Sequence, residues 1–378
     1  MNQSANKLQQ FPSFMPSLML FHLAGMETMP CPKPFRWCKL CNLVWNSPKY
    51  VFKILLCFLL LSEAVWCIFF MESKDELGSL IILILIASTN TVIFRSRKKI
   101  KVLLNKLSQV FSISHFTHRY KTLQLSILMY WIFMLIVDSI FLSMLLKLST
   151  FHRLRIKNSH AIPDDLKDPL LVIRYISFVF TVVTLHCVTV SFTSYYCFIC
   201  KCIKQLFYEL ESKLEVSIVD NNYKAFLQIY DEITQAMILA DSFLGFPAFV
   251  IVLTSMFGLF CFGYAFAFSS TQSYIIYLFT ITGVMHYFST LLMVLLPGSV
   301  ANEAAEMSKE TIFSLPGWFP KNYLSVKMNV RQRFKKTFSM TLWKIYVIRK
   351  SLLISVLGTL VTYGFLVGTL GTVRNSDT

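Results

Sequence analysis

Apolar residues gather in seven long stretches, which polar and basic segments separate. A helix needs about 20 mostly apolar residues to cross a bilayer, and each stretch is of that order. Backbone groups inside a bilayer have no water to bond, which favours a helix in each stretch. The sequence predicts seven transmembrane helices, at residues 50–71, 77–94, 123–146, 170–200, 243–268, 274–296 and 351–373.

The composition supports a membrane protein. Of the 378 residues, 55% are hydrophobic and 15% are charged, whereas a soluble domain carries about 25% charged residues. This excludes a soluble enzyme, a disordered regulator and a nucleic-acid-binding protein. The net charge of +16 is then explained by the Lys and Arg residues that orient membrane proteins, and we expect no nucleic-acid partner.

The distribution of Lys and Arg predicts the orientation of the chain. Most of these residues lie in the N-terminal tail and in the second, fourth and sixth loops, which would share one side of the membrane. Because cytosolic loops are the basic ones, the N-terminus is expected in the cytosol and the C-terminus outside. The predicted fold class is an all-α, polytopic membrane protein with seven transmembrane helices and a helical cytosolic anchor region.

The loops on the cytosolic side have helical periodicity of their own. Apolar residues recur at three- and four-residue steps across residues 201–242, with a turn expected at 220–222. In the sixth loop, helices are expected at 301–313 and 324–343, on either side of a Pro-containing break. The predicted organisation is a cytosolic tail (1–49), helices 1–6 with a cytosolic extension (50–300), cytosolic helices (301–350), a pore-lining last helix (351–373) and an extracellular tail (374–378).

Catalytic, metal and cofactor sites are not expected, so we predict that the protein is not an enzyme. Cys31, Cys38 and Cys41 lack the spacing of a zinc finger, and the His residues form no ligand box. Three further cysteines lie at the inner end of the fourth span, where palmitoylation and plain apolar filling are alternatives. They are Cys197, Cys200 and Cys202.

The last span has a stripe of hydroxyl side chains. At about 100° per residue, five of them share an arc of about 80°, together with one apolar residue, Leu366. The hydroxyl residues are Ser351, Ser355, Thr359, Thr362 and Thr369. Such a stripe serves either helix packing, with each hydroxyl bonded to its own backbone, or a pore wall, with Leu366 closing the water path. The pore needs an oligomer, and Gly364 on the opposite face would let the helix pack closely against its own subunit.

The centre of this span resembles a known sequence signature. Arthropod gustatory receptors have Thr-Tyr in their last helix, followed by five mostly apolar residues and Gln-Phe. Thr362 and Tyr363 match the first pair, and residues 364–368 occupy the apolar positions. Thr369 and Leu370 stand where Gln and Phe are usual. Together with the length, the seven spans and the inverted topology, the resemblance covers residues 50–373.

The resemblance implies a ligand-gated, non-selective cation channel in the plasma membrane of sensory neurons. The last helices of four subunits would line the pore at Ser355, Thr359, Thr362, Leu366 and Thr369. The expected partners are a small tastant or nutrient, permeant cations, membrane lipid and other subunits, in a homotetramer or a heteromer with related receptors. The alternatives are a seven-helix G-protein-coupled receptor, which needs the opposite orientation, and a membrane transporter.

Ionisable and aromatic residues in the outer half of the bundle are candidates for ligand binding. Asp138 and Arg174 lie within spans and on the same side, where they would form a pair beside a polar ligand. Alternatively, Arg174 extends to the interface and Asp138 bonds a neighbouring hydroxyl. Aromatic side chains with polar tips suit small organic ligands. The aromatic candidates are Tyr175, Phe257, Tyr264, Tyr274 and Tyr277.

Overall fold

The structure is a computed structural model. It describes residues 120–157, 164–268, 274–334 and 338–376, and scattered positions between 54 and 110. The predictions for residues 1–49 and most of those for the first two spans lie outside the described residues. The elements are α5 (Tyr120–Lys157), α6 (Asp164–Leu185), the π-helical turn η2 (His186–Val190), α7 (Ser191–Ser212), α8 (Leu214–Val219), α9 (Tyr223–Phe268), α10 (Tyr274–Trp318), the 3-10 turn η3 (Pro320–Asn322), α11 (Tyr323–Arg333), β1 (Thr341–Leu342), β2 (Tyr346–Val347) and α12 (Lys350–Ser376).

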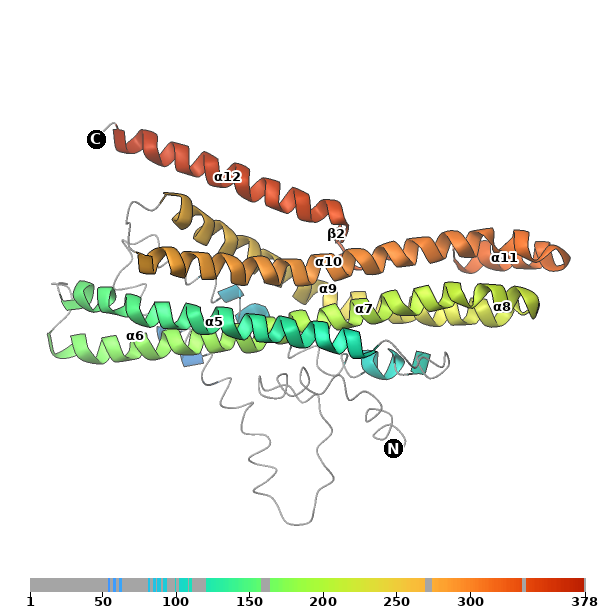
Figure 1. The fold of residues 1–378 in the computed structure, drawn as a ribbon, viewed down its shortest axis with the longest axis horizontal. Coiled ribbons are helices and arrows are strands. Elements are labelled where there is room, and N and C mark those ends of the chain that lie inside the picture. Colours follow the sequence, from blue (N-terminus) through green and yellow to red (C-terminus); the bar gives the residue numbers. More distant parts are fainter. Residues whose placement is uncertain are drawn as a thin grey trace, which may run out of the picture.

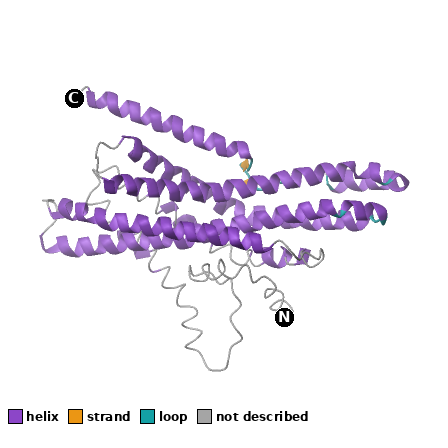
Figure 2. Cartoon of the chain, viewed as in Figure 1, coloured by secondary structure: helices purple, strands orange, loops and turns teal. Residues whose placement is uncertain are grey.

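Long helices run side by side along the longest axis of the molecule (Figure 1). Within the described residues, three helical stretches are long and apolar enough to cross a membrane: Leu125–Met144, Tyr223–Ala267 and Tyr274–Trp318. A shorter apolar helix covers Lys350–Leu366. Almost all the described secondary structure is helical, apart from one small strand pair (Figure 2).

Helix α7 lies at the centre of the core. All ten residues from Ser191 to Cys200 are buried, and α7 contacts both α9 and α10. Burying such a helix on every side favours hydroxyls that bond within the helix. Thr193 does so, because its hydroxyl donates to the carbonyl of Thr189 at 2.9 Å. Ser191 and Ser194 are exceptions, because their hydroxyls have no partner among the described residues. Helix α6, turn η2 and α7 follow one another without a break, so the helix of the fourth predicted span continues past residue 200 to Ser212.

The ends of α7, α9 and α10 join α8 and α11 in a helical platform, on the right in Figure 1. We use this name for residues 201–242 and 299–350. The turn between α8 and α9 lies at residues 220–222, as the sequence predicts, and Asn221 adopts a φ of 49° there. Asparagine tolerates this left-handed conformation better than most residues. The ring of Tyr230 on α9 packs edge-on against the ring of Phe334, the C-cap of α11, with 5.1 Å between the ring centroids.

The second helix predicted in the sixth loop is too long. A helix was expected over 324–343, but α11 ends at Arg333, and the chain then forms an antiparallel hairpin in which Thr341 pairs with Val347. Thr, Trp, Ile, Tyr and Val between 341 and 347 favour extended backbone. The predicted break between the two helices is present but begins later than Pro316: α10 continues through Pro316 to Trp318, and α11 begins at Tyr323.

Helix α12 lies apart from the rest of the bundle in Figure 1 and runs back along it from the hairpin. It packs on α9 and α10 through one apolar face, which includes Leu353, Val356 and Leu360. The opposite face is exposed, with Ile354 at 73% and Leu366 at 50% of full accessibility. An apolar helix with so much uncovered surface requires lipid or further subunits around it.

Candidate functional site

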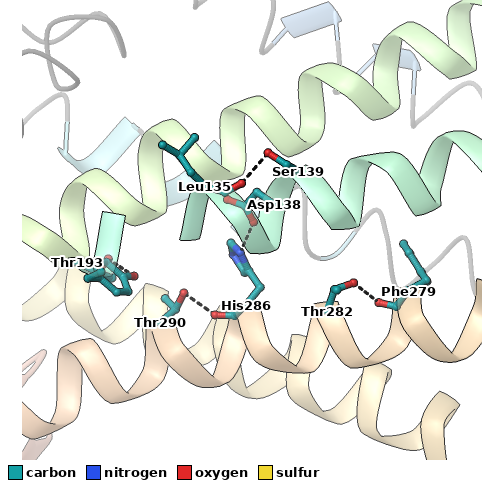
Figure 3. Close-up of polar contacts among 9 residues, drawn as sticks. Leu135, Asp138, Ser139, Thr193, Phe279, Thr282, His286 and Thr290 are labelled. Atoms are coloured by element: carbon teal, nitrogen blue, oxygen red, sulfur yellow. Dashed lines mark hydrogen bonds and ion pairs between the residues drawn. The ribbon is translucent and has the colours of Figure 1, made fainter. Parts of the chain in front are cut away.

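A buried polar pair joins α5 to α10 in the membrane-spanning part of the bundle. The Nδ1 atom of His286 lies 2.7 Å from the Oδ1 atom of Asp138, and the two residues are 3% and 6% exposed. Figure 3 shows the imidazole of α10 directed at the carboxylate of α5. The other ring nitrogen of His286, Nε2, is buried and has no hydrogen-bond partner among the described residues. That atom is free to bind a polar group of a ligand or a water molecule.

A second polar contact connects α5 to α7. The Tyr130 hydroxyl lies 3.0 Å from the Thr193 hydroxyl. The one hydroxyl hydrogen of Thr193 already goes to its own helix, so Tyr130 is the donor of this bond. Thr290, one helical turn after His286, donates to the His286 carbonyl at 2.9 Å. Hydroxyl, imidazole and carboxylate groups from α5, α7 and α10 therefore occur within one buried layer (Figure 3).

An aromatic cluster lies beside this layer. The ring of Tyr287 meets the His286 ring edge-on at 5.0 Å between centroids, and Phe262 packs on Tyr287 at 5.8 Å. Phe141 and Phe279 complete the cluster, with their rings stacked at 4.7 Å. A methyl group at Gly283 would overlap the Phe262 ring, so glycine is needed there for the close approach of α9 and α10. The cluster gives the polar pair an apolar, aromatic surround of the kind that small organic ligands use.

The predicted aromatic candidates have separate surroundings. Tyr175 is 44% exposed on α6, Tyr274 is 76% exposed at the start of α10, and Phe257 is half-buried on α9. Tyr264 stacks on Phe260, and Tyr277 packs edge-on against Phe266. The side chain of Arg174 lies outside the described residues, so its pairing with Asp138 stays a prediction.

Sequence reasoning missed His286. The rule that singled out Asp138, an ionisable residue within a span, applies equally to a histidine in the sixth span. His286 was the only histidine in that span and its partner lies 148 residues away, so its importance emerges only from the packing of α5 on α10.

The hydroxyl stripe of α12 lies on its exposed face. Ser355, Thr359 and Thr362 are exposed, and each donates its hydroxyl hydrogen to the carbonyl four residues earlier, at 3.1, 2.7 and 2.9 Å. A hydroxyl engaged in this way still has lone pairs that point away from the helix and can accept from water or coordinate a cation. The side chain of Thr369 lies outside the described residues.

The two described glycines of α12, Gly358 and Gly364, do not pack against the subunit. A methyl group at Gly364 would meet nothing within 4 Å, and the same holds for Gly358. The expectation that Gly364 packs closely on its own subunit is therefore wrong. The contact is made instead by Leu353, Val356 and Leu360 on another face of the helix.

The hairpin that leads into α12 is fastened to α9 and α10. The side-chain amide of Asn302 donates to the carbonyls of Met340 and Ile348 at 2.9 and 2.8 Å, and its oxygen accepts from the Met340 N–H at 2.6 Å. On α9, one carboxylate oxygen of Asp241 accepts from the Thr341 N–H and hydroxyl at 2.6 and 2.8 Å. The segment that precedes α12 is thus hydrogen-bonded directly to α10, the helix that carries His286.

Solved structures share this arrangement along nearly the whole chain. The insect olfactory receptor OR5 from Machilis hrabei superposes with a TM-score of 0.69 and 13% sequence identity, covering 96% of this chain and 99% of that one. The same receptor in complex with eugenol gives a TM-score of 0.67 and 11% identity, covering 97% and 100%. The chain has the fold of an insect olfactory receptor. No protein-family model and no curated protein matches the sequence.

The olfactory-receptor fold confirms the predicted fold class, an all-α, polytopic membrane fold. The orientation of the two termini stays a prediction. Because the likeness extends from the membrane helices to the platform, α12 and the polar pair can be interpreted within one receptor fold.

Proposed function

We propose that the chain is a subunit of a gustatory-receptor-like chemoreceptor, a ligand-gated, non-selective cation channel that a small tastant or nutrient opens. The observation that carries the proposal is the exposed hydroxyl stripe of α12, on a helix that packs on its subunit through the opposite apolar face. One helix cannot enclose a pore, so four subunits would arrange their last helices around a common axis. The olfactory-receptor fold and the Thr362-Tyr363 motif support this choice over an enzyme, a transporter or a G-protein-coupled receptor.

In this proposal, cations pass along Ser355, Thr359 and Thr362, and the hydroxyl oxygens replace part of the ion's hydration shell. Their hydrogens are bonded inward along the helix, so each oxygen presents its lone pairs to the ion. Leu366, 50% exposed on the same stripe, would close the path by dewetting when four copies meet. The predicted pore constriction lies toward the extracellular end of α12.

The ligand is proposed to bind beside Asp138 and His286. Eugenol, bound by the olfactory receptor of like fold, is a small aromatic molecule with polar groups. The aromatic cluster and the unpartnered Nε2 atom of His286 fit a ligand of that general kind here. A ligand there would shift α10, whose residue Asn302 holds the hairpin about 24 Å further along the helix. Pro297 lies between the two positions and removes one backbone hydrogen bond, which provides a point of bending.

A matched pair of cysteine variants tests the pore. Thr359 and Val361 are both exposed on α12 in the single subunit, but they lie on different faces of the helix. A water-soluble, charged thiol reagent is expected to block the current of Thr359→Cys and to leave that of Val361→Cys unchanged. Equal modification of both, or block of Val361→Cys alone, would refute the pore assignment.

Epitope tags at Met1 and Thr378 test the orientation on intact cells. We expect an antibody to label the tag at Thr378 and to reach the tag at Met1 only after the cells are permeabilised. The opposite result would favour a G-protein-coupled receptor, for which an external N-terminus is required.

A further inference from the structure

A cavity of about 350 Å³ lies at the platform end of α12, apart from the proposed ligand pocket. Its walls come from α7, α9, α10, the segment before β1 and the start of α12. The lining includes Thr234, Ala305, Ser339, Val347, Ile348 and Lys350. The volume is within the range of small-molecule sites, about 300–1,000 Å³.

The interior of the cavity combines apolar surface with polar side chains, which include Tyr230, Thr234, Ser299 and Asn302. Ser299 and Asn302 already donate to backbone carbonyls. Phe207, Met237 and Ile348 are buried and contribute ring, thioether and aliphatic surface. Thr234 is 4% exposed, and its Oγ1 atom makes no hydrogen bond of ordinary length among the described residues, although the Tyr230 hydroxyl lies close to it. A buried hydroxyl without a partner is costly, so a ligand that supplies a donor or acceptor there gains binding free energy.

Each charged group of the cavity lining already has a partner. Lys309 lies over the Phe313 ring, with its Nζ atom 5.6 Å from the ring centroid. Glu303 on α10 pairs with Lys350 on α12 at 2.7 Å, and Glu306 pairs with Arg349 at 3.8 Å. These side chains are between 52% and 69% exposed. An anionic ligand would face two carboxylates at the mouth, and a cationic ligand would face two basic groups. The arrangement favours an uncharged ligand.

We propose that this cavity is a second binding site, which takes a small uncharged molecule with an apolar body and one hydroxyl or carbonyl group. The polar group bonds Thr234, and the apolar body packs on Met237 and Ile348. Binding here requires neither the cation channel nor the tastant pocket proposed above, so the two proposals stand or fall separately.

The site is placed to influence α12. Ile348 and Lys350 form one wall, and the facing wall is the stretch of α10 that holds the hairpin through Asn302. A molecule bound between these walls stabilises the observed spacing between α10 and the N-terminal end of α12. The expected role is that of a modulator, which alters the response to a ligand bound elsewhere.

Protection from alkylation measures binding directly. Ser339→Cys introduces a thiol into the half-buried cavity wall, and Met307→Cys places one on the exposed face of α10 outside the cavity. The purified full chain is treated with N-ethylmaleimide, and each site is followed by peptide mass spectrometry. Benzyl alcohol and cyclohexanol are the probes. At a concentration of twice its dissociation constant, an alcohol is expected to lower the alkylation rate of the thiol in Ser339→Cys about threefold. The alkylation rate of the thiol in Met307→Cys should stay unchanged.

Two further changes, each made in the Ser339→Cys chain, separate cavity binding from general effects of the alcohol. Ala305→Phe fills the cavity and should abolish the protection. Thr234→Val keeps the shape and removes the hydroxyl, so the affinity for benzyl alcohol should fall about fivefold, as for one lost hydrogen bond. Binding of toluene, which has no polar group, should not change.

Three results would overturn the proposal. The first is that neither alcohol protects Ser339→Cys in a monodisperse, folded protein. The second is that protection persists in Ala305→Phe, which would place the alcohol elsewhere. The third is protection by inorganic phosphate without protection by the alcohols, which would show that the site selects an anion.

Discussion

His286 and Asp138 connect the first third of α10 to the middle of α5 through a hydrogen bond of 2.7 Å, with both side chains almost fully buried. Such a bond in a low-dielectric interior is stronger than in water, and the cost of breaking it is correspondingly high. It also fixes the orientation of the imidazole, and with it the direction in which the Nε2 atom points. The pair therefore combines a structural role with a defined position for one ligand-binding atom.

Asp138→Ala is expected to destabilise the protein, because it leaves His286 without a partner in a buried site. The cost should be about 1–3 kcal/mol, measured as a loss of thermal stability in detergent. Ser139→Ala is the matched control, because the exposed Ser139 hydroxyl donates to the Leu135 carbonyl of its own helix. Equal stability of Asp138→Ala and Ser139→Ala would contradict the structural role of the pair.

His286→Ala tests the ligand-binding role. If the Nε2 atom bonds a ligand, the variant should need a higher ligand concentration for a half-maximal response. One lost hydrogen bond should raise that concentration about fivefold or more. A shift in ligand sensitivity without loss of surface expression is the expected result. An unchanged dose–response curve would remove His286 from the proposed pocket.

Leu366→Ala should raise the current that flows without ligand, because a smaller side chain leaves a wider and more easily hydrated constriction. Whole-cell recording at equal surface expression is the measurement. Phe365→Ala is the control, since Phe365 is 66% exposed but lies about 100° around the helix from Leu366. Basal current that rises equally in both variants would argue against a gate at Leu366.

Asn302→Leu should weaken the attachment of α10 to the hairpin that precedes α12. The variant preserves the side-chain volume but removes three hydrogen bonds to Met340 and Ile348, at a cost of at least about 2 kcal/mol. The expected result is lower thermal stability and a weaker response to ligand at unchanged ligand affinity. Gln332→Ala on the exposed surface of α11 should affect neither quantity. Loss of ligand affinity in Asn302→Leu would mean that Asn302 acts on the pocket itself.

The cysteines of α7 should resist modification. Cys197, Cys200 and Cys202 are at most 2% exposed, which favours apolar filling over palmitoylation. Burial, reinforced by the neighbouring thiols, raises the pKa of Cys202 well above its ordinary value. A raised pKa lowers the fraction of reactive thiolate at any given pH. Maleimide should therefore label these residues in denatured protein and leave them unlabelled in folded protein, and labelling of the native state would contradict the packing.

Features that depend on neighbouring residues were predictable from the sequence. The membrane-spanning stretches of α5, α9 and α10 follow from local hydropathy, and the helical platform follows from three- and four-residue periodicity. The turn at residues 220–222 follows from consecutive Asp and Asn residues. The stripe on α12 needed only the geometry of one helix, and its hydroxyls lie on one exposed face of that helix.

Errors arose where distant contacts override local preference. The chain after Arg333 was expected to remain helical, but Asn302 and Asp241 offer its backbone hydrogen-bond partners that a helix would leave unused. Gly364 was expected to face its own subunit, but the larger apolar residues of α12 make that contact.

The sequence by itself determined that the chain is a helical membrane protein, where the membrane-spanning stretches of α5, α9 and α10 lie, and which face of the last helix is polar. These are properties of short segments, and the bilayer constrains each segment separately. Only the tertiary structure decided that His286 is the partner of Asp138, that a hairpin joins α10 to the root of α12, and that a cavity lies between them. Each of these depends on side chains that are far apart along the chain, and their meeting is set by how whole helices pack.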